Sequence, residues 1–339
     1  MKDIDQDLVS DKWYRVERSS GVVYSPFKVT KTEFFAPFPE RLPVPFEIVK
    51  TIQENKSCMY LGDGFFEREV EDESDKEHEL APGIYRHVGP NSGREGLVPH
   101  ELREDEYIPL GSACEEVVND IRNFLSGEQY YKEIGSLHKL GVLLYGDPGN
   151  SKTTTIREIL RKSEKDDAIV IFINEGMPTL EFFECMNKSL NNTLKIFIFE
   201  ELTTNMSDYR FVEKMLNFLD GESSLNKMIT LATTNYPSKL PGNMVDRPSR
   251  FDKIIEFSNP NEADREKLLT HFLQEPAKPE EVLKTKGLSI AQIKEVVCLM
   301  KIDKLDFLKA LGKINNRKKI VKAAFDKPKG GVGFGNCED

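Results

Sequence analysis

One segment, GDPGNSKT over residues 146–153, constrains the fold more strongly than any other part of the sequence. It follows an apolar run over residues 141–145 and precedes a stretch of helical character over residues 152–161. A phosphate-binding loop has the template G-x-x-x-x-G-K-[S/T] between a strand and a helix. Its backbone N–H groups turn inward around phosphates at a helix N-terminus, where the helix dipole favours anions. The segment therefore predicts a nucleoside-triphosphate site, with ATP and Mg²⁺ as the expected ligands.

Two side chains of this segment have distinct expected roles. Lys152 supplies a positive charge for the β- and γ-phosphates, and the Thr153 hydroxyl is a ligand for Mg²⁺. Ser151 replaces the second template glycine and must adopt the backbone angles that glycine usually takes. If φ is positive there, the cost is about 1 kcal/mol. The residues expected to line the nucleotide are Gly146, Asp147, Pro148, Gly149, Asn150, Ser151, Lys152, Thr153 and Thr154.

Two carboxylates follow a second apolar run, over residues 194–199. Acids at the end of a buried strand suit the metal and the attacking water of an NTPase site. We expect Glu200 on the metal side, one methylene longer than the aspartate of the usual Asp-Glu pair. Glu201 is the expected general base that polarises the attacking water.

Further candidates follow along the chain. Asn235, after an apolar strand over residues 228–232, is placed to hydrogen-bond both the attacking water and the γ-phosphate. Arg247 and Arg250 offer two fixed guanidinium groups, which suit the spread charge of a phosphoryl-transfer transition state. Taken alone, each pattern also occurs by chance, and surface salt bridges would equally explain the arginines.

The periodicity predicts an α/β fold, a P-loop NTPase parallel sheet with helices on both faces. Apolar strands over residues 141–145, 168–173, 194–199, 228–232 and 253–257 alternate with helices over residues 152–161, 179–190 and 208–219. A capping box at Ser112–Glu115 starts a helix that ends near Gly127, and residues 111–258 form the expected ATPase subdomain. Helices over residues 261–273, 289–300 and 304–313 predict a small helical lid subdomain over residues 259–325. The Gly-rich tail, residues 326–339, is expected to be disordered.

Residues 1–110 have a different character, with dense prolines and aromatics and short apolar stretches such as residues 21–24 and 83–85. They predict a β-rich recognition or assembly domain, with one helix near residues 46–54. The acidic run over residues 67–79 is expected to be a solvated loop.

Composition limits the alternatives. A net charge of −10 does not favour general nucleic-acid binding. No apolar run approaches the ~18 residues of a membrane span, so no membrane association is expected. Five widely spaced cysteines without a C-x-x-C pair favour reduced thiols and a cytoplasmic location. The five histidines lack ligand spacing, so no metal beyond Mg²⁺ is expected.

In this order, the elements closely resemble an AAA-type ATPase module over residues 111–300. LNFLDG over residues 216–221, ATTN over residues 232–235 and RFD over residues 250–252 are similar to family segments, with Ser249 in place of a glycine. The resemblance implies a homo-oligomeric ring, commonly a hexamer, in which Arg247 and Arg250 act in trans on the neighbour's nucleotide. Residues 124–135 look like the same region in the mitochondrial AAA translocase of the Rieske protein and its soluble relatives. No aromatic-apolar-Gly pore loop occurs between residues 173 and 194.

These features favour a ring-forming ATPase that remodels or translocates a partner macromolecule, more plausibly a protein than a nucleic acid. One alternative is an ATP-binding scaffold or switch with little turnover, because Ser151, Glu200 and Ser249 depart from the family pattern. Another is a nucleic-acid motor or loader that uses the basic cluster near residues 313–329.

Overall fold

The computed structural model describes residues 13–325, apart from 19–20, 26–29, 36–57, 63–64, 72–76, 79, 90–94, 103–107, 109–110, 164–166, 175, 221–224 and 248. The helix expected near residues 46–54 and the tail over residues 326–339 lie outside the described residues. Within the described part of the chain, none of the helices combines the length and the apolar character needed to cross a membrane.

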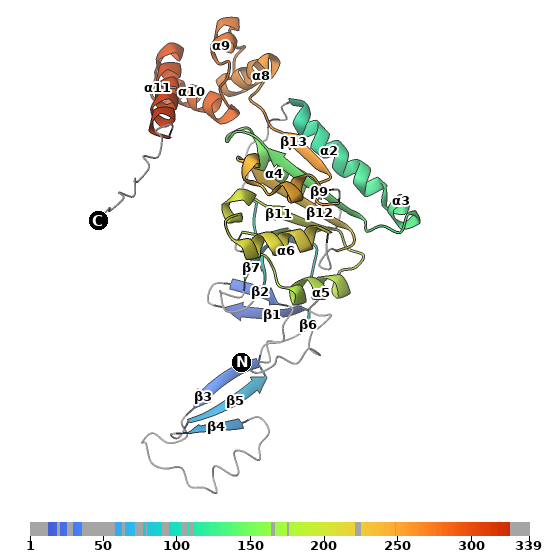
Figure 1. The fold of residues 1–339 in the computed structure, drawn as a ribbon. Coiled ribbons are helices and arrows are strands. Elements are labelled where there is room, and N and C mark those ends of the chain that lie inside the picture. The colour runs from blue at the N-terminus through green and yellow to red at the C-terminus, as the bar shows by residue number, and fades with distance from the viewer. Residues whose placement is uncertain are drawn as a thin grey trace, which may run out of the picture.

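A ten-stranded sheet is the centre of the molecule, and six of its strands run parallel (Figure 1). In spatial order these six are β13 (Lys253–Glu256), β9 (Lys139–Tyr145), β12 (Met228–Thr234), β11 (Lys195–Phe199), β10 (Ile169–Phe172) and β7 (Gly83–Val88). The sheet then continues through the antiparallel strands β8 (Gly96–Pro99), β2 (Gly21–Ser25), β1 (Trp13–Arg18) and β6 (Glu77–His78). The predicted α/β class with a mostly parallel sheet is thus confirmed.

Helices cover both faces of the parallel strands, as the continuous apolar character of these strands requires. Buried side chains of α2 (Gly111–Ser126) and α4 (Lys152–Ser163) pack on one face. Those of α5 (Leu180–Ser189) and α6 (Tyr209–Asp220) pack on the other. The short elements of this part are α3 (Glu128–Glu133), η3 (Leu202–Asn205), η4 (Pro237–Lys239) and α7 (Gly242–Val245). Helix α2 begins at Gly111, so the predicted cap Ser112 lies inside its first turn.

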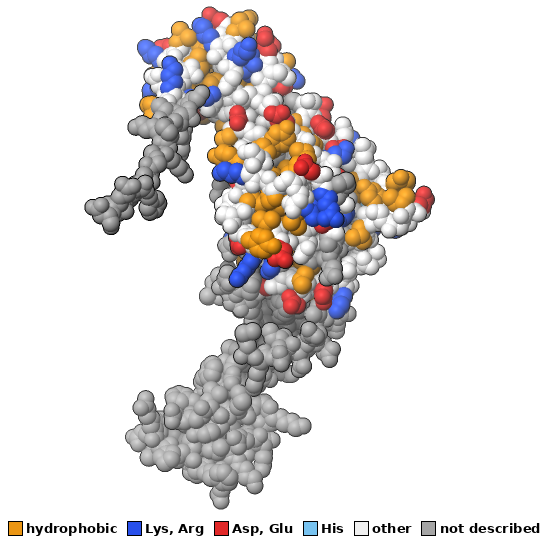
Figure 2. Space-filling view, in the orientation of Figure 1, with side chains coloured by type: hydrophobic (Ala, Val, Ile, Leu, Met, Phe, Trp, Pro, Cys, Tyr) orange, Lys and Arg blue, Asp and Glu red, His pale blue; other side chains and the backbone are white. Residues whose placement is uncertain are grey.

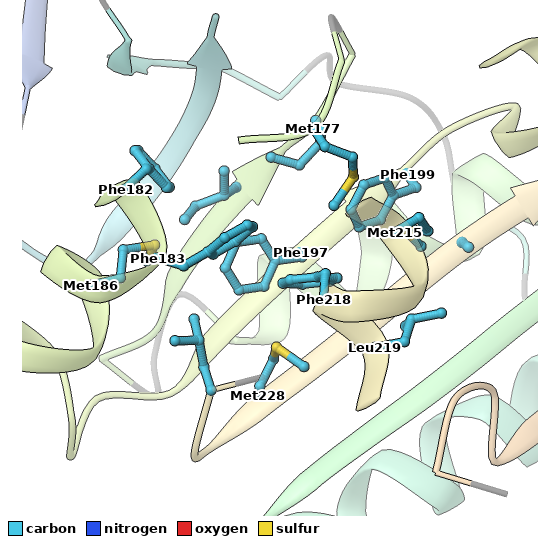
Figure 3. Close-up of a cluster of buried hydrophobic side chains, with 14 of the residues drawn as sticks. Met177, Phe182, Phe183, Met186, Phe197, Phe199, Met215, Phe218, Leu219 and Met228 are labelled. Carbon is cyan, nitrogen blue, oxygen red and sulfur yellow. The ribbon is translucent and has the colours of Figure 1, made fainter. Parts of the chain in front are cut away.

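Aromatic rings fill the face beneath α5 and α6 (Figure 3). The ring of Phe218 lies 5.0 Å from that of Phe183 and 4.9 Å from that of Phe197, measured between centroids. Such pairs add roughly 0.5–1.5 kcal/mol each beyond area burial. Phe182 and Phe183 are 0% and 4% exposed, so both pack in the core.

The C-terminal region is helical, as predicted, and has an apolar core of its own. It contains α8 (Glu262–Leu273), α9 (Pro279–Lys284), α10 (Ile290–Ile302) and α11 (Phe307–Phe325). Asn261 and Ser289 accept hydrogen bonds from the first turns of α8 and α10, because their side-chain oxygens suit unpaired N–H groups there. The sequence does not predict α9, and the expected bounds of 304–313 for the last helix are wrong. Helix α11 begins at Phe307 and extends past residue 313, because Lys, Arg and Ala are good helix formers.

The N-terminal strands join the parallel sheet directly. Residues Ile169–Phe172 of β10 pair in parallel with Gly83–Arg86 of β7. Trp13 is 1% exposed, packs edge-on against Phe182 and donates a hydrogen bond from Nε1 to Ser189 Oγ at 3.0 Å. The division of the chain at residue 110 stays a prediction, since the hydrogen-bonded sheet runs across it.

A second sheet of three antiparallel strands lies at the end of the molecule opposite α8–α11 (Figure 1). Its order is β3 (Thr30–Phe35), β5 (Phe65–Glu71) and β4 (Cys58–Gly62). The acidic residues over 67–71 therefore belong to a strand, and β6 contains residue 77. The expectation of a loop over residues 67–79 is wrong for these positions, because backbone pairing with β3 and β4 outweighs the local preference of acids for loops.

Gly141, in the middle of β9, has no room for a side chain. A Cβ atom there would lie 1.9 Å from the carbonyl oxygen of Arg250, and the Gly141 N–H donates to Asp252 Oδ2 at 2.9 Å. We expect Gly141→Ala to lower the free energy of unfolding by about 3 kcal/mol or more, as overpacking against backbone does. Urea denaturation followed by circular dichroism measures this.

The matched control is Gly312→Ala in α11, where a Cβ would meet nothing within 4 Å. It is expected to stabilise the protein by about 0.5–1 kcal/mol, because alanine favours helix. Equal effects of the two substitutions would contradict the close approach at Gly141.

Candidate functional site

The phosphate loop leaves β9 at Tyr145 and enters α4 at Lys152, as predicted. Its backbone has positive φ at Gly146 (136°), Gly149 (83°) and Ser151 (65°). A Cβ on Gly146 would lie 2.4 Å from the carbonyl oxygen of Phe257. Ser151 thus adopts the left-handed conformation that the template assigns to glycine, at a cost of about 1 kcal/mol.

Lys152 is the centre of the hydrogen bonds in this loop. Its Nζ donates to the carbonyl oxygens of Gly146 (2.6 Å) and Asp147 (3.0 Å) and to Asn235 Oδ1 (2.7 Å). An ammonium group has three donors, so all of them are used, and a phosphate oxygen must exchange with one of these acceptors. Burial lowers the pKa of Lys152 from its usual range, and the carboxylates of Glu201 and Asp147 oppose the shift.

Asn235 and Glu201 continue this hydrogen-bonded chain. Asn235 Nδ2 donates to Glu201 Oε1 at 2.6 Å. The Glu201 N–H donates to Thr233 Oγ1 at 3.0 Å, which holds Glu201 in a left-handed conformation with φ 50°. The structure therefore brings together the phosphate clamp, the sensor and the base that the sequence predicted in three separate segments.

A hollow of about 180 Å³ contains these groups. Its lining residues are Pro148, Gly149, Asn150, Ser151, Lys152, Thr153, Thr154, Glu201 and Asn235. A second hollow of about 130 Å³ shares Asn150 and Ser151 with it and extends between the β13 end and the helical region. Most of the predicted phosphate-loop residues thus line one concave site with the predicted base and sensor.

Glu200 is half-buried and directly follows the last residue of β11. Burial, together with the charges of Arg86 and Arg157, lowers the pKa of His100, and the Glu200 carboxylate opposes this shift. The His100 ring packs edge-on against Phe172, with 5.0 Å between the ring centroids. Thr153 lies at the start of α4. The side chains of Thr153 and Glu200 are both predicted from the sequence to hold Mg²⁺; Thr153 lines the hollow, whereas Glu200 is not among its lining residues.

The donor set fits that ion. Among the described residues, no group of three or more His, Cys, Asp or Glu side chains could hold a metal. Mg²⁺ is usually bound by one or two protein oxygens together with substrate phosphates and water, rather than by an all-protein cage.

The two arginines occupy different environments, and neither lines the hollow of the phosphate loop. Arg250 is 6% exposed, and its Nε donates to Asp220 Oδ2 at 2.9 Å while Nη1 donates to the carbonyl oxygen of Asn243. The Arg247 side chain is 64% exposed and lies 3.6 Å from Asp220 Oδ2. A role in trans stays a prediction for both, but only the guanidinium of Arg247 is presented at the surface.

Sequence reasoning missed Asp220 as the partner of Arg250. Asp220 belongs to the LNFLDG segment noted above and is the last residue of α6. It can pair with Arg250 only because α6 ends beside the segment that connects β12 to β13. The long-range pairing of residues 30 positions apart has no periodicity that would reveal it.

Comparisons with known proteins agree with this geometry. Residues 142–259 match the family described as "ATPase family associated with various cellular activities (AAA)". A probable mitochondrial chaperone BCS1-A of Dictyostelium discoideum is 27% identical over 197 residues, covering 52% of this chain and 46% of that protein. An AAA-ATPase of Arabidopsis thaliana is 30% identical over 170 residues, covering 42% and 36%. A proteasome-activating nucleotidase of Sulfurisphaera tokodaii is 27% identical over 217 residues, covering 56% and 55%. The chain thus spans about a third to a half of the length of these relatives.

The burial of Arg250 leads to a stability prediction. Arg250→Ala leaves Asp220 partly buried without its main cation, so we expect the free energy of unfolding to fall by about 3–5 kcal/mol. Arg247→Ala removes an exposed and distant contact, and its effect should lie within about 0.5 kcal/mol. Urea denaturation of both variants is the measurement, and a similar loss in both would contradict the different environments described here.

Proposed function

We propose that this chain, which carries an AAA-family ATPase domain over residues 142–259, hydrolyses ATP with Mg²⁺ and uses the reaction to remodel or translocate a partner macromolecule. The observation that carries the proposal is the hydrogen-bonded chain from Lys152 through Asn235 to Glu201 inside one hollow. It places a cation, an amide and a carboxylate at the end of a phosphate loop, which is the set of groups that nucleotide hydrolysis requires.

The chemistry follows from these positions. The inward N–H groups of the loop and the Lys152 ammonium bind the phosphates, and exchange of Lys152 from loop carbonyls to phosphate oxygens offsets its buried charge. Glu201 accepts the proton of the attacking water, while Asn235 orients that water and the γ-phosphate. Mg²⁺, held by Thr153 and Glu200, would supply charge neutralisation between the phosphates.

Assembly is the second part of the proposal. Proteins of the AAA family are typically oligomeric, and we propose a homo-oligomeric ring, most plausibly a hexamer, located in the cytoplasm. The exposed guanidinium of Arg247 supports a role at the neighbour's nucleotide. Arg250 is less suited, because it is buried and three of its five N–H groups already donate to Asp220 and to the carbonyl oxygen of Asn243. Cys114 and Cys185 are buried and form no disulfide, which agrees with a reducing compartment.

An ATP-binding scaffold with little turnover is a second candidate, and the strained Ser151 is the observation that favours it. Tight ATP binding without phosphate release from the assembled protein would establish it.

The structure offers less support for a nucleic-acid motor. The α11 cations Lys309, Lys313 and Arg317 pair with Asp306, Asp303 and Glu295, and positive and negative side chains are mixed over the visible face of this region (Figure 2).

Glu201→Gln tests the base assignment. The variant keeps size and hydrogen-bonding capacity but not basicity, so we expect steady-state phosphate release to fall by about 10²–10⁴-fold. Binding of a fluorescent ATP analogue should persist. Glu213→Gln, the same change at an exposed position of α6, is the control and should match the wild type. Equal turnover of Glu201→Gln and wild type would exclude Glu201 as the base.

A mixing experiment tests the trans role of Arg247. Arg247→Ala and Glu201→Gln should each turn over poorly as pure proteins. In a ring of randomly mixed subunits at equal concentration, about a quarter of the interfaces combine an intact Glu201 with an intact neighbouring Arg247. We therefore expect the mixture to recover up to about a quarter of wild-type phosphate release. A mixture no more active than the mean of its two components would contradict shared sites.

A further inference from the structure

Asn150 occupies a position that the phosphate-loop template leaves unspecified. It lies between Gly149 and Ser151, both of which have left-handed backbone conformations, with φ of 83° and 65°. Its side chain is nonetheless among the most buried polar groups of the chain, at 2% exposure. A buried amide must use its donors and acceptor within the protein, so its partners reveal what it holds.

Those partners lie outside the phosphate loop. Asn150 Nδ2 donates to Asn259 Oδ1 at 3.1 Å and to the carbonyl oxygen of Phe257 at 3.4 Å. Its Oδ1 accepts from the N–H of Ile290, the first residue of α10, at 3.4 Å. Residues 257–261 connect β13 to α8, and we call this segment the hinge. The Asn150 side chain therefore contacts both the hinge and the helical region beyond it.

The backbone of the loop adds a second connection at the same place. The Ala291 N–H donates to the carbonyl oxygen of Gly149 at 3.0 Å. A Cβ on Gly149 would lie 2.9 Å from Ala291 Cβ and 3.0 Å from Ser289 Oγ. The start of α10 therefore rests directly on the outer side of the loop, whose other side lines the hollow with Lys152.

These contacts alter the role that the sequence suggested for Asn150. It was expected to line the nucleotide, and it does border the hollow. Its side-chain amide, however, is committed to Phe257, Asn259 and Ile290, so the side chain is not a free phosphate ligand.

We propose that Asn150 is a positioning residue that latches the phosphate loop to the hinge and to α10, so that loop and lid move together. The second half of this inference rests on the proposed function, because the loop must bind ATP for nucleotide to be the input. A ligand shifts a conformational equilibrium only through differential contacts with the two states. Phosphates on the inner side of the loop would contact the same loop whose outer side binds α10 through Gly149 and Asn150, and the coupling requires that they change these outer contacts.

The latch itself is tested without nucleotide, by hydrogen–deuterium exchange of the full chain. In Asn150→Ala, the amides of Ile290 and Ala291 should exchange about fivefold faster, which is the effect of losing a hydrogen bond of ordinary net strength. Asn259→Ala, at an exposed hinge position, should give a smaller rise of about twofold. Asn192→Ala, the same change in an exposed turn at the other end of the sheet, should give none. Unchanged exchange in Asn150→Ala, with its fold verified by circular dichroism, would overturn the latch.

The coupling is tested by adding Mg²⁺ and a non-hydrolysable ATP analogue. In the wild type, exchange should change both in the loop peptide over residues 146–155 and in the lid peptide over residues 288–292. In Asn150→Ala, the loop peptide should still respond, because its backbone N–H groups remain, while the lid response should fall below about a fifth of its wild-type size. A full lid response in Asn150→Ala would overturn the coupling. No protection of the wild-type loop peptide would instead refute the proposed function and leave the latch to the nucleotide-free result.

Discussion

The register of β9 between β12 and β13 is the constraint on which the rest of this structure depends. Tyr145 pairs with Thr234 on one side and with Glu256 on the other, so three parallel strands end at the same level. Because the chain leaves all three at one edge, the phosphate loop, Asn235 and Phe257 meet there. Gly141 makes this register possible, since any side chain at its position would strike the backbone at Arg250. Hydrogen bonds of the sheet thus place both the proposed nucleotide site and the contact to the helical region.

Strain at this edge is compensated by hydrogen bonds. Ser151 and Glu201 both adopt left-handed conformations that L-residues disfavour, and both line the hollow proposed to bind phosphate. The Thr233 hydroxyl accepts from the Glu201 N–H, and the Ser151 carbonyl oxygen accepts from Thr155. The Lys152 ammonium group donates three hydrogen bonds, to the carbonyl oxygens of Gly146 and Asp147 and to Asn235 Oδ1. The connection of this site to α10 consists of the backbone hydrogen bond from Ala291 to Gly149 at 3.0 Å and the longer one from Ile290 to Asn150 at 3.4 Å.

Patterns of short range were sufficient for much of this architecture. The parallel strands and their helices could be predicted because buried strands are continuously apolar and helices repeat every 3.6 residues. The misses had physical causes. The acidic residues over 67–71 pair in β5 because neighbouring strands supply backbone partners, and α9 is too short to show a period. The pairing of β7 with β10 depends on a contact between segments more than 80 residues apart, for which no local signal exists.

The chemical roles of individual side chains could be predicted before the fold was known. A Gly-rich turn followed by Lys-Thr is typical of phosphate binding, and acids after an apolar strand are typical of a metal and water site. The spatial partners of these side chains could not be predicted. In the tertiary structure, Asn235 links Lys152 to Glu201 by hydrogen bonds. Arg250 is paired with Asp220, whereas Arg247 is exposed. The side chain of Asn150 is hydrogen-bonded to Asn259 in the hinge. The physical reason is that motifs encode the types of groups a ligand requires, whereas burial and hydrogen bonding between distant segments determine which groups remain available to it.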